Sequence, residues 1–344
     1  MSGSRFTLVA LGLFVCASCA EENAAGAGGD SGTGGVGGDT GTGGSFVPPP
    51  ESLSITWGPY DVESEREDTM CVVKRLGNAE PVYAHQIFNE LGATSHHFIV
   101  YKVSDTVERP EPFSCNPFLD TLDPEKGAPI MITQKAEDLL TLPDGVVYEF
   151  EPNQMIRLEL HFINVSASTQ EATATSTFIP IPEEDVEAVA DIMFMGDGDI
   201  SIPAGESRTL GPSFIEAPAA LNGVSYFAIT GHQHQWGTNV YVEIAANADA
   251  PGTPVYDVDN FLWDEPATVT YATPFTIPNG GGFNITCDWT NDSVRTVGFG
   301  TGVNDEMCFF WAYYYPSNGA VVCVNNIFGV SFCCPGPLCD LLPF

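Results

Sequence analysis

The stretch Met155-Ile156-Arg157-Leu158-Glu159-Leu160-His161-Phe162 decides the fold class, because apolar and polar side chains alternate along it. A period of two residues indicates a β-strand with one buried face. Similar short apolar runs recur from residue 51 onward, separated by Gly, Pro, Asn and Asp, whereas helical patterns are sparse. Many short strands with turn residues between them predict an all-β protein built of β-sandwiches.

The length and charge of the chain define its broad class. A chain of 344 residues is long enough for two domains. Two prolines in Phe178-Ile179-Pro180-Ile181-Pro182 end a strand-like run, so we expect an N-terminal domain over 51–182 and a C-terminal domain over 183–344. No sequence repeat relates them. The net charge of −34 repels phosphate backbones, which argues against a nucleic-acid partner.

The N-terminus resembles an export signal. Arg5 precedes the apolar run Phe6–Val15, which is too short to span a bilayer. The small residues before Cys19 resemble a bacterial lipoprotein processing site, so we predict a signal segment over 1–19 and lipidation at Cys19. Cleavage by an ordinary signal peptidase is the alternative. The segment 20–50, rich in Gly, Ser and Pro, is expected to be a disordered tether. This predicts a bacterial cell-envelope protein whose only membrane contact is the anchor.

An even number of cysteines remains after such processing. They are Cys71, Cys115, Cys287, Cys308, Cys323, Cys333, Cys334 and Cys339. In an exported protein this pattern indicates disulfides. The last four form a C-terminal cluster, for which two disulfides are expected and a metal site is the alternative.

Two histidines lie two positions apart in Thr230-Gly231-His232-Gln233-His234-Gln235-Trp236-Gly237. Side chains two apart in an extended strand point the same way, so His232 and His234 can bind one metal ion. No further histidine is left for this half, and Met307 is the candidate third ligand. A thioether with two imidazoles favours Cu(I), although a methionine beside an aromatic run is usually part of a core.

The N-terminal half holds three candidate ligands, His96, His97 and His161. Neighbouring residues in a regular strand point to opposite faces. His96 and His97 can therefore share a metal only if the strand begins, twists or bulges there. The remaining histidine, His85, is expected to be structural or exposed.

Taken in order, these motifs resemble one family. His96-His97 before an apolar strand, Leu160-His161-Phe162, the His-x-His of 232–234 and Asp305-Glu306-Met307-Cys308 resemble the copper type II ascorbate-dependent monooxygenases. That family includes peptidylglycine α-hydroxylating monooxygenase and dopamine β-monooxygenase. The resemblance covers roughly residues 53–316.

The resemblance implies a fold, a cofactor and a reaction. It implies two tandem jelly-roll sandwiches with one copper on each, facing across a solvent-filled cleft. His96, His97 and His161 would hold the electron-storing copper, and His232, His234 and Met307 the copper at which oxygen is activated. The reaction would hydroxylate a C–H bond of a small organic substrate, using O₂ and electrons from ascorbate or a similar one-electron donor. The resemblance also pairs Cys71 with Cys115 and Cys287 with Cys308.

Two positions depart from the peptide-amidating members of that family. Thr230 stands where those members have an arginine, and Trp311 stands where they have a tyrosine. In those members the arginine and the tyrosine bind the substrate carboxylate. A glycine-extended peptide is therefore not the expected substrate. The run Phe309-Phe310-Trp311 with Tyr313 instead suggests an apolar or aromatic one, although some of these residues are expected to be ordinary core. A copper-buffering surface protein without turnover, and a plain adhesion or carbohydrate-binding sandwich, are the alternative functions.

Overall fold

The computed structural model describes residues 46–115, 127–300, 302–327 and 329–334. Within these ranges the regular structure is β-strand, with two 3₁₀ turns at Glu183–Asp185 and Ala219–Leu221, so the predicted all-β class is confirmed. No helix in the described ranges has the length and apolar character needed to cross a membrane. The predicted signal segment 1–19, Cys19 and most of the tether 20–50 lie outside the described residues.

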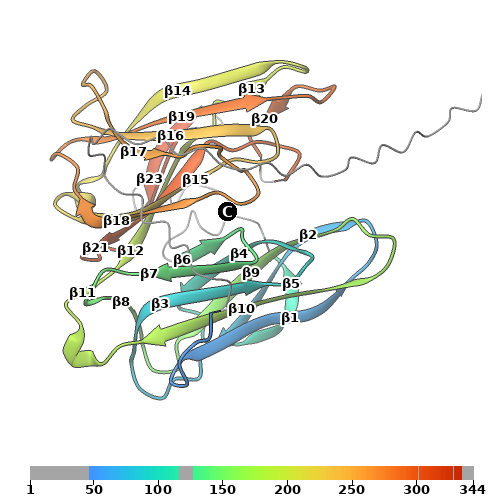
Figure 1. The fold of residues 1–344 in the computed structure, drawn as a ribbon, viewed down its shortest axis with the longest axis vertical. Coiled ribbons are helices and arrows are strands. Elements are labelled where there is room, and N and C mark those ends of the chain that lie inside the picture. Colours follow the sequence, from blue (N-terminus) through green and yellow to red (C-terminus); the bar gives the residue numbers. More distant parts are fainter. Residues whose placement is uncertain (1–45, 116–126, 301, 328, 335–344) are drawn as a thin grey trace, which may run out of the picture. The chain divides into compact units, whose positions relative to one another are not determined.

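The first eleven strands form one sandwich (Figure 1). They are β1 (Leu53–Val62), β2 (Arg66–Arg75), β3 (Val82–Leu91), β4 (Ser95–Val103), β5 (Arg109–Ser114), β6 (Gly127–Thr133), β7 (Glu137–Thr141), β8 (Val146–Phe150), β9 (Met155–Asn164), β10 (Gln170–Pro180) and β11 (Ala188–Val189). One sheet has the order β1-β10-β3-β8-β11, with β7 beside β3, and the other has the order β5-β2-β9-β4-β6. Strands β1 to β4 alternate between the two sheets, and so do β8, β9 and β10, as in a jelly roll.

The remaining strands form a second sandwich (Figure 1). They are β12 (Asp191–Asp197), β13 (Ser201–Ile202), β14 (Ser207–Glu216), β15 (Ser225–His232), β16 (Gly237–Ala245), β17 (Thr253–Asp257), β18 (Thr268–Phe275), β19 (Gly282–Thr290), β20 (Val297–Gly298), β21 (Phe309–Tyr315), β22 (Val321–Ile327) and β23 (Val330–Cys334). Its sheets run β18-β15-β21-β12-β22-β23 and β14-β19-β16-β17, and β13 pairs with β20. The central strands repeat the jelly-roll order of the first sandwich.

The two sandwiches also have a similar corner, formed by a buried asparagine at the end of a strand and the turn that follows it, although no sequence repeat is detectable. Asn164 is the last residue of β9, and its side chain donates to the carbonyls of Val62, Glu63 and Ser168 while accepting from the backbone N–H of Ser166. Asn291, directly after β19, binds Ile202, Pro203 and Arg295 and accepts from Ser293 in the same way. Both asparagines are buried, so each corner is a fixed part of the fold.

Strand β21 is buried on both faces. Phe310, Ala312 and Tyr314 lie in the core of the second sandwich, whereas Phe309, Trp311 and Tyr313 belong to a cluster shared with the first. Strand β21 pairs with β12 on one side and β15 on the other, which makes it a central strand. Each of Phe309, Phe310, Trp311 and Tyr313 is at most 2 % exposed, so these side chains are packed in the interior.

Disulfides link strands and their flanking residues within each sandwich. Cys71 bonds Cys115, Cys287 bonds Cys308, and Cys323 bonds Cys333 across the β22–β23 pair. Cys334 is also disulfide-bonded, and Cys339 lies outside the described residues. Disulfides of this number indicate an oxidising, extracellular environment.

Candidate metal centres

A β-bulge brings His96 and His97 together at the start of β4. His97 pairs directly with His161 on β9, but Ser95 pairs with Phe162, so two residues of β4 span one step of β9. His96 is the extra residue. A bulge of this kind re-aims a side chain, which removes the difficulty of two neighbouring ligands in one strand.

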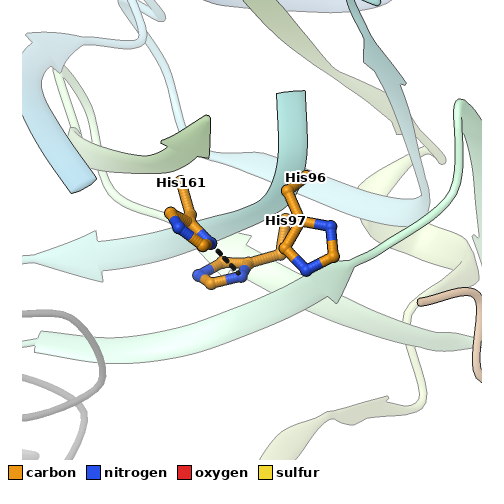
Figure 2. A group of neighbouring side chains, drawn as sticks. All are labelled: His96, His97 and His161. Carbon is orange, nitrogen blue, oxygen red and sulfur yellow. Dashed lines mark hydrogen bonds between the residues drawn. The ribbon is translucent and has the colours of Figure 1, made fainter. Parts of the chain in front are cut away.

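The three imidazoles gather on one side of the sheet (Figure 2). One ring nitrogen from each lies within 4.8 Å of those of the other two. Nδ1 of His161 is 3.3 Å from Nδ1 of His97, the contact drawn as a dashed line in Figure 2. Three convergent imidazole nitrogens are a donor set suited to copper or zinc.

Glu67 on β2 fixes the orientation of His161. Nε2 of His161 donates to a carboxylate oxygen of Glu67 at 3.0 Å, and this bond is the main cause that lowers the pKa of Glu67. With its proton on Nε2, His161 presents the lone pair of Nδ1 toward His97. In the metal-free protein Nδ1 of His97 donates its proton to this lone pair at 3.3 Å, and a bound cation could take the place of that proton.

The second cluster begins where β15 ends. His232 is the last residue of β15, and His234 lies in the connection to β16 and not in an extended strand as expected. The two rings nevertheless remain neighbours, with centroids 5.2 Å apart and planes at 84°. Nδ1 of His234 donates to the carbonyl of Asp305 at 3.1 Å, which leaves Nε2 as its lone-pair nitrogen.

Glu306 holds this connection and Met307 in one arrangement. Its fully buried carboxylate accepts from the backbone N–H groups of His234 and Met307, at 3.0 and 3.2 Å, and from that of Trp236 at 2.9 Å. The indole of Trp289 donates a fourth bond at 2.9 Å. The backbones of one histidine and the methionine are therefore linked through a single carboxylate.

Met307 lies just before the strand that pairs with His232. His232 pairs with Phe309, the first residue of β21, and Met307 precedes this residue by two positions. Met307 is 2 % exposed and belongs to the same buried cluster as Phe309 and Trp311. Trp311, which replaces the tyrosine of the amidating enzymes, lies with its ring 6.0 Å from that of His232.

The first sandwich contacts the second cluster directly. Gln134, just after β6, bonds both His232 and the carbonyl of Trp263. The Trp263 ring lies 5.4 Å from His96. Val47–Phe344 is one compact unit, so both clusters belong to the same folded body.

Four of the five clustered histidines are buried. His97, His161, His232 and His234 are each at most 6 % exposed, whereas His96 is partly exposed. Burial lowers the pKa of His96 and of His234 to about 4, and it lowers the pKa of His97 and of His232 well below the ordinary value. The four rings whose pKa is lowered are therefore neutral near pH 7, as metal binding requires.

We expect these buried histidines to make the metal-free protein less stable in mild acid. Their folded-state pKa lies below the unfolded value of 6.5, so the unfolded chain binds more protons between pH 6.5 and 4. Each such group lowers the free energy of unfolding by up to about 1.4 kcal/mol per pH unit in that window. Urea unfolding of the metal-free protein at pH 7 and pH 5 measures the effect.

A histidine variant separates the contribution of the buried histidines to the pH dependence of stability from that of buried carboxyl groups, which act in the opposite direction. Burial raises the pKa of Asp138 and Asp191, and that of Glu306 to about 7, and acid favours the folded state through these groups. Wild type is therefore compared with His97→Leu, which lacks one buried imidazole. Wild type should lose more unfolding free energy from pH 7 to pH 5 than His97→Leu does. An equal or smaller loss in wild type would contradict the expectation.

The sequence did not indicate four residues that shape these clusters, namely Glu67, Gln134, Trp263 and Glu306. Glu306 lies in the motif with Met307, but nothing in its spacing reveals four hydrogen bonds. Glu67, Gln134 and Trp263 reach the clusters only through strand pairing and side-chain contact. His85 lies apart, as expected, with Nδ1 bonded to the carbonyl of Val146.

Comparison with solved structures gives only weak likenesses. The major capsid protein P2 of bacteriophage PM2 has a TM-score of 0.34 at 7 % identity, covering 78 % of this chain and 99 % of that one. PNGase F, a glycosylasparaginase from Flavobacterium meningosepticum, has a TM-score of 0.32 at 10 % identity, covering 78 % and 97 %. These values carry no argument about function. No curated protein sequence matches the chain.

A protein-family comparison matches the region that holds the second cluster. The match covers residues 188–330 and is to the C-terminal domain of copper type II ascorbate-dependent monooxygenases. It contains His232, His234 and Met307 together with the Glu306 clamp. This part of the chain, with the second jelly roll, therefore belongs to the copper type II ascorbate-dependent monooxygenase family.

Proposed function

We propose that the protein is a copper-dependent monooxygenase that hydroxylates a C–H bond of a small organic substrate with O₂ and ascorbate or a similar one-electron donor. One observation carries the proposal. A three-histidine cluster on the first jelly roll accompanies a His-x-His and methionine set inside a domain of the monooxygenase family.

The donor chemistry supports two different copper sites. His96, His97 and His161 would hold one copper through imidazole nitrogen alone, a set that suits both copper oxidation states. His232, His234 and Met307 would hold the other, and the thioether favours the reduced state. Bound at these places, copper supplies one-electron storage at the first site and oxygen activation at the second.

The chain's own residues would prepare these sites before any metal arrives. Glu67 and the Asp305 carbonyl hold protons on opposite ring nitrogens of His161 and His234, so each ring offers one defined lone pair. Glu306 fixes the backbone spacing of His234 and Met307. Burial keeps bulk water from the reacting groups.

A copper count on His161→Ala tests the assignment of ligands to two sites. The variant should lose copper from the first site and the electron storage that it supplies, and it should keep the copper of the second. His85→Ala is the matched control, because this histidine lies outside both clusters. Loss of all copper from His161→Ala would show that the partition is wrong.

Turnover is tested by oxygen consumption with ascorbate in the copper-loaded protein, combined with a screen of small organic substrates. A catalyst consumes oxygen in a substrate-dependent manner and yields a hydroxylated product. Stoichiometric copper without turnover would indicate a copper-buffering surface protein. Absence of stoichiometric copper after dialysis would indicate the third function, a plain adhesion or carbohydrate-binding sandwich.

The proposed location follows from the N-terminal segment together with the disulfides. We propose that the chain is exported in a bacterium and anchored to the cell envelope through a lipid on Cys19. Labelling with a fatty-acid analogue tests this, because Cys19→Ser should abolish the label. An unchanged label would exclude Cys19 as the modified residue.

A further inference from the structure

Gln134 belongs to the first sandwich, but its side chain forms hydrogen bonds with two residues of the second, His232 and Trp263. It directly follows β6 and is 8 % exposed. Its Oε1 lies 3.1 Å from Nδ1 of His232, and its Nε2 lies 3.3 Å from the carbonyl oxygen of Trp263. One buried side chain thus bonds both a candidate ligand and Trp263, whose ring lies 5.4 Å from that of His96.

The direction of both bonds follows from the chemistry of the acceptors. A carbonyl oxygen only accepts, so the group of Gln134 that faces Trp263 must be its amide nitrogen. The amide oxygen therefore faces His232 and accepts the proton of Nδ1. With Nδ1 protonated, the neutral ring carries its lone pair on Nε2, the same nitrogen that the Asp305 carbonyl leaves for His234.

The strand beneath Gln134 links it to the first cluster. Thr133 ends β6 and pairs with Phe98 on β4, one residue after His97. The Thr133 hydroxyl accepts a 2.8 Å bond from the side chain of Asn89, and both residues are fully buried. This packing fixes the base of the Gln134 side chain relative to His96 and His97.

We propose that Gln134 is a positioning residue of the second site, selecting the His232 tautomer that presents Nε2. The proposal rests on the proposed copper function for its purpose, but the tautomer exists without metal. The second site is therefore incomplete without the first sandwich, which supplies this bond.

Two substitutions separate the two bonds. Gln134→Glu keeps an oxygen acceptor for His232 and loses the donor to Trp263. Gln134→Met keeps similar volume and loses both. Gln154→Met is the matched control, because Gln154 is also 8 % exposed in the first sandwich and its amide bonds the carbonyls of Val103 and Met155 instead.

The first readout is the ¹⁵N spectrum of the ring nitrogens in the metal-free protein, with His232 assigned by its loss in His232→Asn. Wild type, Gln134→Glu and Gln154→Met should show His232 protonated at Nδ1. Gln134→Met should show a population protonated at Nε2. The wild-type spectrum alone is decisive, since an Nε2-protonated His232 there overturns the proposal even if Gln134→Met does not fold. An unchanged tautomer in folded Gln134→Met also overturns it.

The second readout is the Cu(I) affinity of each site. Gln134→Met should weaken the second site about 10- to 100-fold and leave the first unchanged, as expected for the loss of a hydrogen-bond partner of a ligand. Gln134→Glu should retain most of the affinity. Equal weakening by the Gln154→Met control would overturn a specific role. If no variant binds copper, the proposed function fails, whereas the tautomer result still decides the role of Gln134.

Discussion

Glu306→Ala is expected to lose about 3 kcal/mol or more of unfolding free energy, together with the copper of the second site. The carboxylate is fully buried and accepts from the backbones of His234, Trp236 and Met307 and from the indole of Trp289. Alanine leaves these donors without their acceptor, and each buried unsatisfied donor costs about 1–3 kcal/mol.

Urea unfolding and a copper count measure the two parts of this result. The first site should keep its copper, because Glu306 does not contact it. Glu243→Ala is the matched control, since this glutamate lies on β16 of the same sandwich but is only half-buried. A loss below about 0.5 kcal/mol, within the range of ordinary surface substitutions, would contradict the role of Glu306 as a clamp. Two retained coppers would contradict it as well.

Met307→His is expected to keep copper and to lose most hydroxylating activity. An imidazole replaces the soft thioether, so the site no longer favours the reduced metal. We expect a loss of more than about tenfold in rate, which corresponds to about 1.4 kcal/mol in the barrier. Oxygen consumption and product formation with ascorbate measure this loss.

Met307→Leu separates ligation from packing. Met307 is 2 % exposed among apolar neighbours, and a swap of similar volume costs less than about 1.5 kcal/mol of stability. This variant should fold normally but bind copper weakly at the second site. Full activity of Met307→His, or normal second-site copper in Met307→Leu, would count against the thioether as a ligand.

The fold class was predictable because local patterns carry it. The alternation in Met155–Phe162 does form β9, whose Ile156, Leu158, Leu160 and Phe162 enter the core. The expected single buried face is wrong, because Arg157, Glu159 and His161 on the other face are at most 8 % exposed. The run at Phe309–Tyr315 shows no alternation because this central strand has apolar side chains on both buried faces. A continuous apolar run does not reveal that one of its faces packs against a second domain.

The histidine clusters were only partly predictable. The sequence indicates which histidines are candidates, and the bulge at His96 supplies the geometry that neighbouring ligands require. It does not indicate Glu67 or Gln134, because their partners are distant along the chain: Glu67 is 94 positions from His161 and Gln134 is 98 positions from His232. Such contacts are set by strand register and by packing between the sandwiches, not by local spacing.

The most direct measurement of the central claim is a copper count per folded chain combined with X-ray absorption of the reduced protein. Two coppers are predicted, one bound by nitrogen alone and the other with a sulfur neighbour that disappears in Met307→His. A single copper, or two coppers without any sulfur neighbour in the wild type, would contradict the assignment of His96, His97 and His161 to one site and His232, His234 and Met307 to the other.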